Sequence, residues 1–341
     1  MTPPAPRWTR LVVHASLILG IAACSETPYG PASGDRSGAL ELAKGPPPKG
    51  SVVLDPAAVI ESTNAALAFE DADYRLLLIE TISGDTAEAG ITVVWKNVGN
   101  KMLGHDFVPG DPRRDVAGGG WSTDPNSITY SIDPFDGTTF NGVGPATTSA
   151  EIRDGLATWN VLSCSDPDLT EVTSPVDLGV IAFLNGLGGS PFVVADIHYG
   201  GWLEVEYAGP TIAATHTFIW VDDDGNPTDI DNNGLIDVAF REIYYDRTCQ
   251  ACAGAPNWTW EVHNGINDPG FDIDIESISL HETGHGLSQA HFGTGFVRDK
   301  DGALFETSNS VMAAAYAGPR IDLQGSDSGG HCTIWGEWPQ N

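Results

Sequence analysis

The spacing of apolar residues predicts several strands and one long helix between residues 127 and 245. Ser127–Ile132 alternates between apolar and polar residues with the period of a strand. Apolar runs at Val193–His198, Thr215–Trp220 and Ala239–Tyr245 predict three more strands. Thr148–Leu162 has apolar residues three and four positions apart, as in an amphipathic helix. This mixture of helices and strands favours an α+β fold.

Composition divides most of the chain into a linker and two longer regions. Residues 24–50 are rich in proline, glycine and serine, which predicts a flexible tether. Residues 51–117 contain an apolar stretch at Ala65–Glu80 and a predicted strand at Ile91–Trp95, so we expect an accessory domain or a prodomain there. Three consecutive glycines mark the next boundary, and residues 118–341 form the main predicted domain.

The N-terminal residues predict export. An apolar run, Leu11–Ala23, follows two arginines and is too short to span a membrane, so we expect a signal peptide over residues 1–23. Ile21–Cys24 resembles a bacterial lipobox, which implies lipidation of Cys24 and a cell-envelope lipoprotein at the outer membrane or cell surface. A plain signal peptide cut near Ala23, which would give a secreted protein, is the alternative.

The charge balance limits the possible partners. The chain has 46 acidic and 16 basic residues, and its formal net charge is −30. Nucleic acids and anionic membrane surfaces both need basic patches on a protein, so we expect neither as a partner. Contact with a membrane is then expected only through the lipid anchor at Cys24.

The densest chemistry lies near residue 285. His281 and His285 are four residues apart, so they share one face of a helix, and Glu282 follows the first histidine. This HExxH pattern is typical of metalloproteases, in which two histidines bind zinc and the glutamate takes a proton from metal-bound water. A third histidine, His291, lies six residues further on and completes a candidate metal site.

The surrounding residues favour a helix that begins before this motif and ends within it. Asp272 or Asp274 is a candidate N-cap, and Glu276 falls in the first turn. The chain must turn before the third histidine, and Gly286 with Ser288 supplies small residues for that turn.

His281–His291 resembles the long zinc signature of the metzincins, HExxHxxGxxH, and the residues before it look like the matrixin branch. Ser310–Met312 resembles the methionine turn of these enzymes, in which Met312 would form a hydrophobic floor under the ligands. One position departs from the family. Ser288 stands where the signature has glycine, a residue that lets the chain leave the helix without a steric penalty.

The resemblance implies a metzincin-like catalytic domain with a twisted, mostly parallel β-sheet, a backing helix, an active-site helix and a small C-terminal subdomain after the third histidine. It implies a zinc-dependent endopeptidase in which His281, His285 and His291 bind Zn²⁺ and Glu282 is the general base for zinc-bound water. We expect a monomer that acts on protein or peptide substrates. The tail, Leu323–Gly336, resembles the closing helix of matrixins, but its glycines predict a poor helix.

Two features would shape the substrate cleft of such an enzyme. Thr215–Trp220 is a candidate edge strand, to which an extended substrate peptide would add. Residues between His291 and Tyr316 would form the wall of the pocket for the side chain after the cleaved bond. Phe292, Phe296 and Tyr316 indicate an apolar preference there.

A second candidate metal site lies between two predicted strands. Oxygen ligands recur at alternating positions with a glycine at the sixth, which is the spacing of EF-hand-like calcium loops. The candidate ligands are Asp229, Asp231, Asn233, the carbonyl of Leu235, and Asp237. We expect structural Ca²⁺ here, and an acidic turn without an ion is the alternative.

Besides Cys24, four cysteines remain, and an even number in an exported chain predicts two disulfides. Of the three possible connectivities, we prefer Cys249 with Cys252 and Cys164 with Cys332. The alternative joins Cys249 and Cys252 to Cys332 or His331 at a structural metal.

Two smaller resemblances have ordinary alternatives. His198 and His216 lie on predicted strands, near where matrixins hold a second zinc, and we interpret both as buried histidines with hydrogen-bond partners. Phe107–Asp111 faintly resembles the aspartate latch of astacins, and a Pro-Gly turn is the preferred interpretation.

Two other functions stay open. In a different zincin, Glu306 rather than His291 would be the third zinc ligand. A non-enzymatic, calcium-braced surface lipoprotein or binding module would keep only a relic zinc site. The intact Glu282 argues against the second possibility, because a site that only binds metal does not need that carboxylate.

Overall fold

The computed structural model describes residues 52–84, 89–98, 104–115, 126–165, 167–203, 205–207, 210–247, 259–262, 272–292, 296–297, 304–305 and 310–339. The expected signal peptide and tether lie outside these ranges, as do Cys24, Cys249, Cys252 and Glu306.

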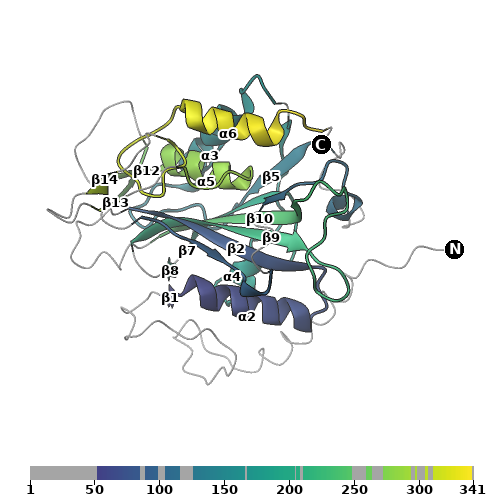
Figure 1. Cartoon of the computed structure of the whole chain (residues 1–341). Coiled ribbons are helices and arrows are strands. Elements are labelled where there is room, and N and C mark those ends of the chain that lie inside the picture. Colours follow the sequence, from purple (N-terminus) through teal and green to yellow (C-terminus); the bar gives the residue numbers. More distant parts are fainter. Residues whose placement is uncertain are drawn as a thin grey trace, which may run out of the picture.

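An eight-stranded sheet forms the centre of the molecule (Figure 1). Its strands run in the order β3–β2–β9–β10–β7–β5–β6, and β4 pairs with β10. They span Tyr74–Ser83 (β2), Thr92–Val94 (β3), His105–Asp106 (β4), Ile128–Ile132 (β5), Leu169–Glu171 (β6), Ile197–Leu203 (β7), Thr211–Trp220 (β9) and Ile236–Asp246 (β10). The pairs from β10 to β6 are parallel, whereas those from β3 to β10 are antiparallel. The α+β class is therefore confirmed, with a mixed sheet.

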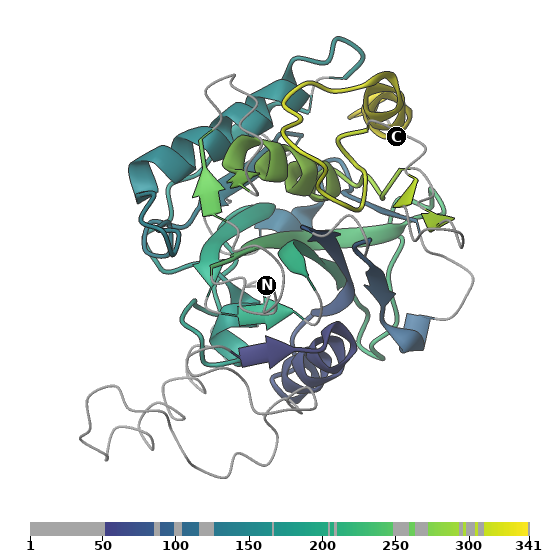
Figure 2. The same ribbon diagram turned by 90° about the vertical axis from the view of Figure 1, so that its left-hand side faces the viewer.

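Helices cover both faces of this sheet. Helices α2 (Pro56–Phe69) and α4 (Val180–Leu184) lie on one face, and α3 (Pro145–Asn160), α5 (Ile275–Gly286) and α6 (Gly325–Trp335) lie on the other (Figures 1 and 2). Each face has its own apolar core. Among the helices in the described ranges, none has the length and apolar character needed to cross a bilayer.

Short elements complete the described chain. Strand β1 (Val52–Leu54) pairs with β8 (Val205–Tyr207), β11 (Thr259–Glu261) pairs with β12 (Asp272–Asp274), and β13 (Phe296–Val297) pairs with β14 (Leu304–Phe305). Two 3₁₀ turns, η1 and η2, span Lys96–Val98 and Pro112–Asp115.

The stretch around residue 70 folds as a helix and a strand that are tied together. Asp55 caps α2, and Asp71, with a φ of 56°, turns the chain back after the helix. The Asn64 side chain donates to the Leu76 carbonyl at 2.9 Å and accepts from the Leu76 N–H at 2.7 Å. These bonds fix the start of β2 against α2.

Strand β2 then pairs with β9 along almost its whole length, from Tyr74 opposite Trp220 to Ser83 opposite Thr211. The prediction that Thr215–Trp220 is an exposed edge is therefore wrong, because a strand from far away in the sequence covers it. Residues 51–117 thus contribute strands to the same sheet as later residues. Their role as an accessory domain or a prodomain stays a prediction.

Helix α6 forms despite three glycines, contrary to the expectation of a poor helix. Gln324 and Asp327 make a reciprocal capping box at its start, and the buried Trp335 packs its last turn onto the core. Tertiary packing here outweighs the low helix propensity of glycine.

Candidate metal centre

The candidate metal centre is built on helix α5. Asp274 is the N-cap, and its carboxylate accepts the Ser277 N–H at 2.9 Å. Glu276 lies in the first turn, where a negative charge favours the helix. His281 and His285 follow one turn apart, and both side chains are buried.

The chain leaves α5 at Ser288, which adopts the left-handed conformation with a φ of 65°. A residue with a side chain is strained there, whereas glycine is not. The Ser288 hydroxyl donates to Asp106 at 3.0 Å and accepts from Arg241 at 2.9 Å. Arg241 also donates to the Gly286 carbonyl at 2.7 Å. These bonds offset the strain, so the turn of the glycine-containing signature forms with serine.

The three histidines converge on one point. Nε2 of His285 lies 3.1 Å from Nε2 of His281 and 3.2 Å from Nε2 of His291. Nδ1 of His281 lies 2.7 Å from the Val311 carbonyl, and Nδ1 of His285 lies 2.8 Å from the Gln289 carbonyl. Because a carbonyl only accepts, Nδ1 carries the proton in both rings, and the Nε2 lone pairs face one another.

This arrangement fits a metal ion. Burial and the neighbouring histidines lower the pKa of His281 well below its ordinary value and that of His291 to about 3. Both imidazoles are therefore neutral, which is the form that binds metals. Converging lone pairs of neutral rings repel one another unless a cation lies between them. The His281, His285 and His291 group can hold a metal ion.

Glu282 lies within the same buried region, where its carboxylate is fully covered. Burial raises its pKa to about 7, against the opposing effects of His285 and of a hydrogen bond from Thr215. The Thr215 hydroxyl donates to Oε2 at 2.5 Å, while Oε1 has no hydrogen-bond partner among the described residues. A carboxylate with this pKa can accept a proton at neutral pH.

A second buried carboxylate, Glu80 on β2, belongs to this region and was not foreseen. Its Oε2 lies 3.2 Å from Nδ1 of His285, whose N–H points to the nearer Gln289 carbonyl. Burial alone would raise the pKa of Glu80 and lower that of His285. Their mutual attraction outweighs burial, so the pKa of Glu80 is lowered and that of His285 is raised. The only sequence signal was an acid inside the apolar run Leu76–Ile82.

Met312 lies directly beside the histidine-bearing helix. It is fully buried, and a β-carbon placed on Gly284 would come within 2.2 Å of its sulfur. Asp327 holds the preceding turn by accepting the backbone N–H groups of Val311 at 3.0 Å and of Met312 at 3.2 Å. The segment that carries Met312 therefore packs closely under α5.

A small pocket opens beside His281. It is formed by the start of α5, the segment after Met312 and the end of β2. Its lining residues are Ile82, Ser277, Ile278, His281, Val311, Ala313, Ala315, Tyr316, Ala317, Gly318 and Arg320. Tyr316 lines this pocket, and most of the other lining groups are apolar.

The candidate calcium loop brings three carboxylates together. One oxygen each of Asp229, Asp231 and Asp237 lies within 4.8 Å of the others. Asn233 takes part in the turn and accepts the Leu235 N–H at 2.7 Å. The carboxylate of Asp237 is shared, because it also accepts from Arg113 at 2.8 Å and from Thr228 at 2.5 Å.

Another acidic group, which the sequence did not indicate, lies at the end of β5. Asp133, Asp136 and Asp177 bring one carboxylate oxygen each within 4.8 Å. Asp133 accepts three backbone N–H groups, from Phe135, Asp136 and Leu178. These bonds organise the local turn, and we assign the group no ligand.

The two strand histidines have partners on the sheet. Nε2 of His198 accepts the N–H groups of Val194 and Ala195 at 3.1 and 3.3 Å. Nδ1 of His216 lies 3.2 Å from the Glu242 carbonyl. Both rings are buried and have hydrogen-bond partners, as expected. Phe107–Asp111 is the preferred Pro-Gly turn, with Gly110 at a φ of 65°.

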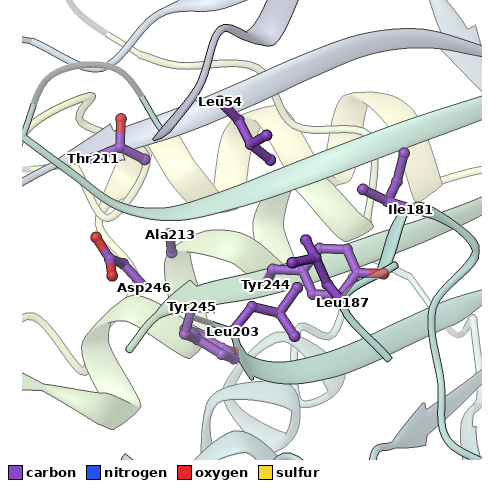
Figure 3. A pocket seen from close by; sticks show the side chains of 9 residues that line it. All are labelled: Leu54, Ile181, Leu187, Leu203, Thr211, Ala213, Tyr244, Tyr245 and Asp246. Atoms are coloured by element: carbon purple, nitrogen blue, oxygen red, sulfur yellow. The ribbon is translucent and has the colours of Figure 1, made fainter. Parts of the chain in front are cut away.

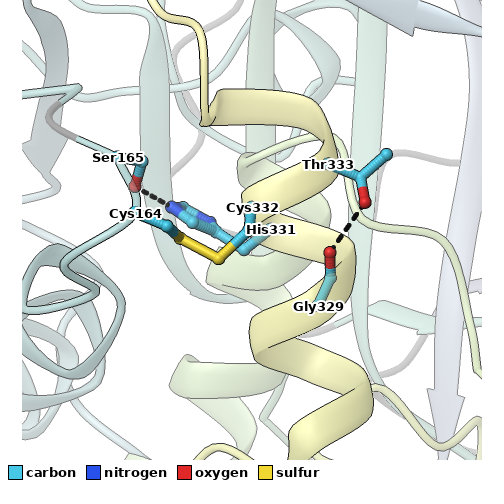
Figure 4. The surroundings of a disulfide bond; sticks show 6 residues. All are labelled: Cys164, Ser165, Gly329, His331, Cys332 and Thr333. Atoms are coloured by element: carbon cyan, nitrogen blue, oxygen red, sulfur yellow. Dashed lines mark hydrogen bonds between the residues drawn. A yellow bond between two sulfur atoms is a disulfide. The ribbon is translucent and has the colours of Figure 1, made fainter.

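A disulfide joins Cys164, just after α3, to Cys332 in α6 (Figure 4). This is one half of the preferred pairing, and the other half lies outside the described residues. His331 next to it faces Ser165, with Nε2 2.6 Å from the hydroxyl. The bridge holds α6 beside the helices that form the histidine site.

A separate, mainly apolar pocket lies between β9, β10 and α4 (Figure 3). None of the three histidines contributes to it. Its lining residues are Leu54, Ile181, Leu187, Leu203, Thr211, Ala213, Tyr244, Tyr245 and Asp246. Without converging polar groups it indicates no chemistry.

Comparison of the sequence with protein-family models and with curated proteins finds no match.

Proposed function

We propose that this protein is a zinc-dependent endopeptidase with a metzincin-like catalytic domain of the matrixin type. The observation that supports it best is the convergence of His281, His285 and His291 beside the buried carboxylate of Glu282. Metal binding alone does not need this carboxylate, whereas peptide hydrolysis needs a base. The placement of Met312 against Gly284 and the turn at Ser288 agree with this proposal.

When bound, zinc supplies Lewis-acid chemistry, because it polarises a peptide carbonyl and acidifies a water molecule. Glu282 accepts the proton of the attacking water at Oε1, while Thr215 fixes the other oxygen. Glu282 then passes this proton to the leaving amine. The low-dielectric surroundings keep the pKa of Glu282 close to neutral, so one carboxyl serves both steps.

His291 is our proposed third ligand. Its Nε2 lies 3.2 Å from that of His285, which places it within the converging group. Replacing His291 by alanine should abolish stoichiometric zinc binding, whereas Glu306→Ala should leave zinc content unchanged. The opposite result would favour the other zincin type.

The decisive experiment uses the full-length chain, Glu282→Gln and a control on the same helix, Glu276→Gln. Zinc is measured by mass spectrometry and cleavage is measured with casein. We expect about one zinc per chain in all three proteins. Turnover should fall by about 10²–10⁴-fold in Glu282→Gln alone. Equal turnover in Glu282→Gln and the parent protein, or absence of zinc, would contradict the proposal.

Calcium at the loop Asp229–Asp237 is a further part of the proposal. The three carboxylates, with the amide oxygen of Asn233 and the carbonyl of Leu235, are the kind of ligands that Ca²⁺ prefers. Calcium should raise the melting temperature of the parent protein but not that of Asp229→Asn. Asp224→Asn, in the neighbouring exposed turn, serves as the control. An equal response of both variants would argue against the site.

Export and lipid anchoring complete the proposal. A monomer held through Cys24 would act on peptides outside the cytoplasm. Labelled palmitate should be incorporated by the parent chain in a bacterial host and not by Cys24→Ser. Release of both forms as soluble protein would instead indicate a plain signal peptide.

The non-enzymatic lipoprotein with a relic site stays the second candidate. The observation that favours it is the burial of the site: His281 is 1% exposed, and Glu282 and His285 are 0% exposed. The third histidine, His291, is partly exposed. The chain segment that covers the other three residues therefore decides between the two functions.

A further inference from the structure

The end of β2 is hydrogen-bonded on both sides. On one side it pairs antiparallel with β9, with Ile82 opposite Ala213. Beyond that pair, Ser83 N–H donates to the Ala314 carbonyl at 3.1 Å, and Tyr316 N–H donates to the Ser83 carbonyl at 2.7 Å. This end of β2 therefore lies in an extended conformation between β9 and the segment that follows Met312.

Two side chains from this strand reach the histidine site. Side chains two residues apart on a strand point to the same face, so Glu80 and Ile82 both point toward α5. Glu80 lies 3.2 Å from Nδ1 of His285. Ile82 lines the pocket that also includes His281 and Tyr316. The backbone from Glu80 to Ile82 therefore passes beside His281 and His285.

We propose that Glu80–Ser83 is a built-in peptide ligand of the active site, an inference that rests on the proposed function. The substrate class that it indicates is an extended peptide with a branched aliphatic side chain in the pocket beside His281. Such a peptide would pair with β9 and with the backbone of Ala314 and Tyr316. It binds only when the end of β2 has left this position.

The pocket supports an aliphatic occupant. Ile278, Val311, Ala313 and Ala315 line it together with Ile82, which is 3% exposed and whose space would join the pocket once the end of β2 has left. A charged side chain would lose its hydration without gaining a partner of opposite charge, apart from Arg320 at one side.

The end of β2 packs on a different core from the rest of the strand. Tyr74, Leu76 and Ile79 belong to the core on the α2 side of the sheet, whereas Ile82 belongs to the core on the α5 side. Local opening of the last residues therefore leaves the α2 core intact, and openings of this limited kind cost less than global unfolding.

The test compares Ile82→Ala with Ile79→Ala, the same change on the opposite face of the same strand. Both are made in the zinc-loaded, full-length chain. The probe is a fluorescein-labelled peptide with the sequence of residues 79–84, Ile-Glu-Thr-Ile-Ser-Gly. Its affinity is measured by anisotropy in a Glu282→Gln background, where it is not cleaved. Cleavage of the same peptide is measured with Glu282 present.

We expect Ile82→Ala to bind the probe at least about tenfold more tightly than the parent protein and to cleave it faster by a similar factor. Ile82→Val should give a smaller gain, and Ile79→Ala should give none. A probe with lysine at the position of Ile82 should bind at least about tenfold more weakly, because the pocket has Arg320 but no acidic side chain in its lining. Zinc content and melting temperature of each variant show whether it has folded.

Equal probe binding by the parent protein and Ile82→Ala would overturn the proposal. So would an equal gain in Ile79→Ala, or no binding by any form. If Ile82→Ala binds the probe more tightly but does not cleave it, the built-in ligand is supported and the protease function is rejected. Equal casein cleavage by the parent protein and Ile82→Ala would keep the protease and reject the built-in ligand.

Discussion

Gly284 offers a direct test of how tightly the candidate metal centre is packed. A β-carbon there would lie 2.2 Å from the sulfur of Met312 and 3.0 Å from Cζ2 of Trp159. In a helix interior, alanine is ordinarily better than glycine by about 0.5–1 kcal/mol. Forcing a methyl group into a filled core costs about 1–3 kcal/mol. We therefore expect Gly284→Ala to lower the free energy of unfolding by about 1–2 kcal/mol.

Two other helix glycines serve as controls. A β-carbon on Gly329 in α6 would meet no atom within 4 Å, so Gly329→Ala should raise the free energy of unfolding by about 0.5–1 kcal/mol. Gly286 is intermediate, since its nearest contact would be a methyl carbon of Ile197 at 3.3 Å. Urea unfolding followed by circular dichroism, with a chelator present, measures all three, because a bound metal would add its own stabilisation.

A double-mutant cycle identifies the clashing partner. Met312→Ala removes the sulfur that the new methyl group would meet, so Gly284→Ala should cost less in that background. We expect a coupling energy of at least about 1 kcal/mol. Stabilisation by Gly284→Ala equal to that by Gly329→Ala, or a cycle without coupling, would refute the predicted clash with Met312.

Three further predictions follow from charges and cross-links. Arg241→Met should weaken zinc binding about tenfold or more in a chelator competition, because Arg241 holds the turn after α5, whereas the exposed Arg153→Met should have no effect. Replacing Cys164 and Cys332 by serine should lower the free energy of urea unfolding by about 4–5 kcal/mol, since the bridge closes a loop of 168 residues. A urea midpoint equal to that of the parent protein would contradict this prediction. Burial and the neighbouring acids Asp177 and Asp133 raise the pKa of Asp136 to about 6. The folded protein therefore binds this proton more tightly than the unfolded chain, which stabilises the fold at acid pH. This contribution is lost as the pH rises through about 6. Asp136→Asn should therefore stabilise the chelated protein at pH 7.5 but not at pH 4, and an equal effect at both would be inconsistent.

The elements that were foreseen are those with strong local signals. The N-cap Asp274, the helical spacing of His281 and His285, and the alternation in β5 depend on residues close together in the sequence. The number of cysteines and the expected export predict two disulfides but leave three connectivities, and the structure shows the Cys164 to Cys332 bridge of the preferred one. Local patterns were sufficient for the helix and the strand.

The features that were missed depend on long-range pairing. Nothing near Thr211–Trp220 indicates that β2 would cover it, because that partner lies more than a hundred residues earlier. In the sequence, Glu80 does not differ from other acids in apolar stretches. Only the pairing of β2 with β9 shows that it lies beside His285. Helix α6 was underestimated because propensity counts its glycines but not the capping box or the buried Trp335.

The departure from the zinc signature at Ser288 is linked to the N-terminal region. A left-handed serine costs about 1–2 kcal/mol, and a hydrogen bond contributes about 0.5–1.5 kcal/mol, with more when a partner is charged. Each of the two bonds, to Asp106 and from Arg241, has a charged partner and is comparable in size to the strain, and together they exceed it. Asp106 belongs to β4, within residues 51–117, and Glu80 of the same region contacts His285. Strand β4 therefore contributes one of the two bonds that stabilise serine at this turn, so the N-terminal residues help to shape the histidine site as well as to contact it.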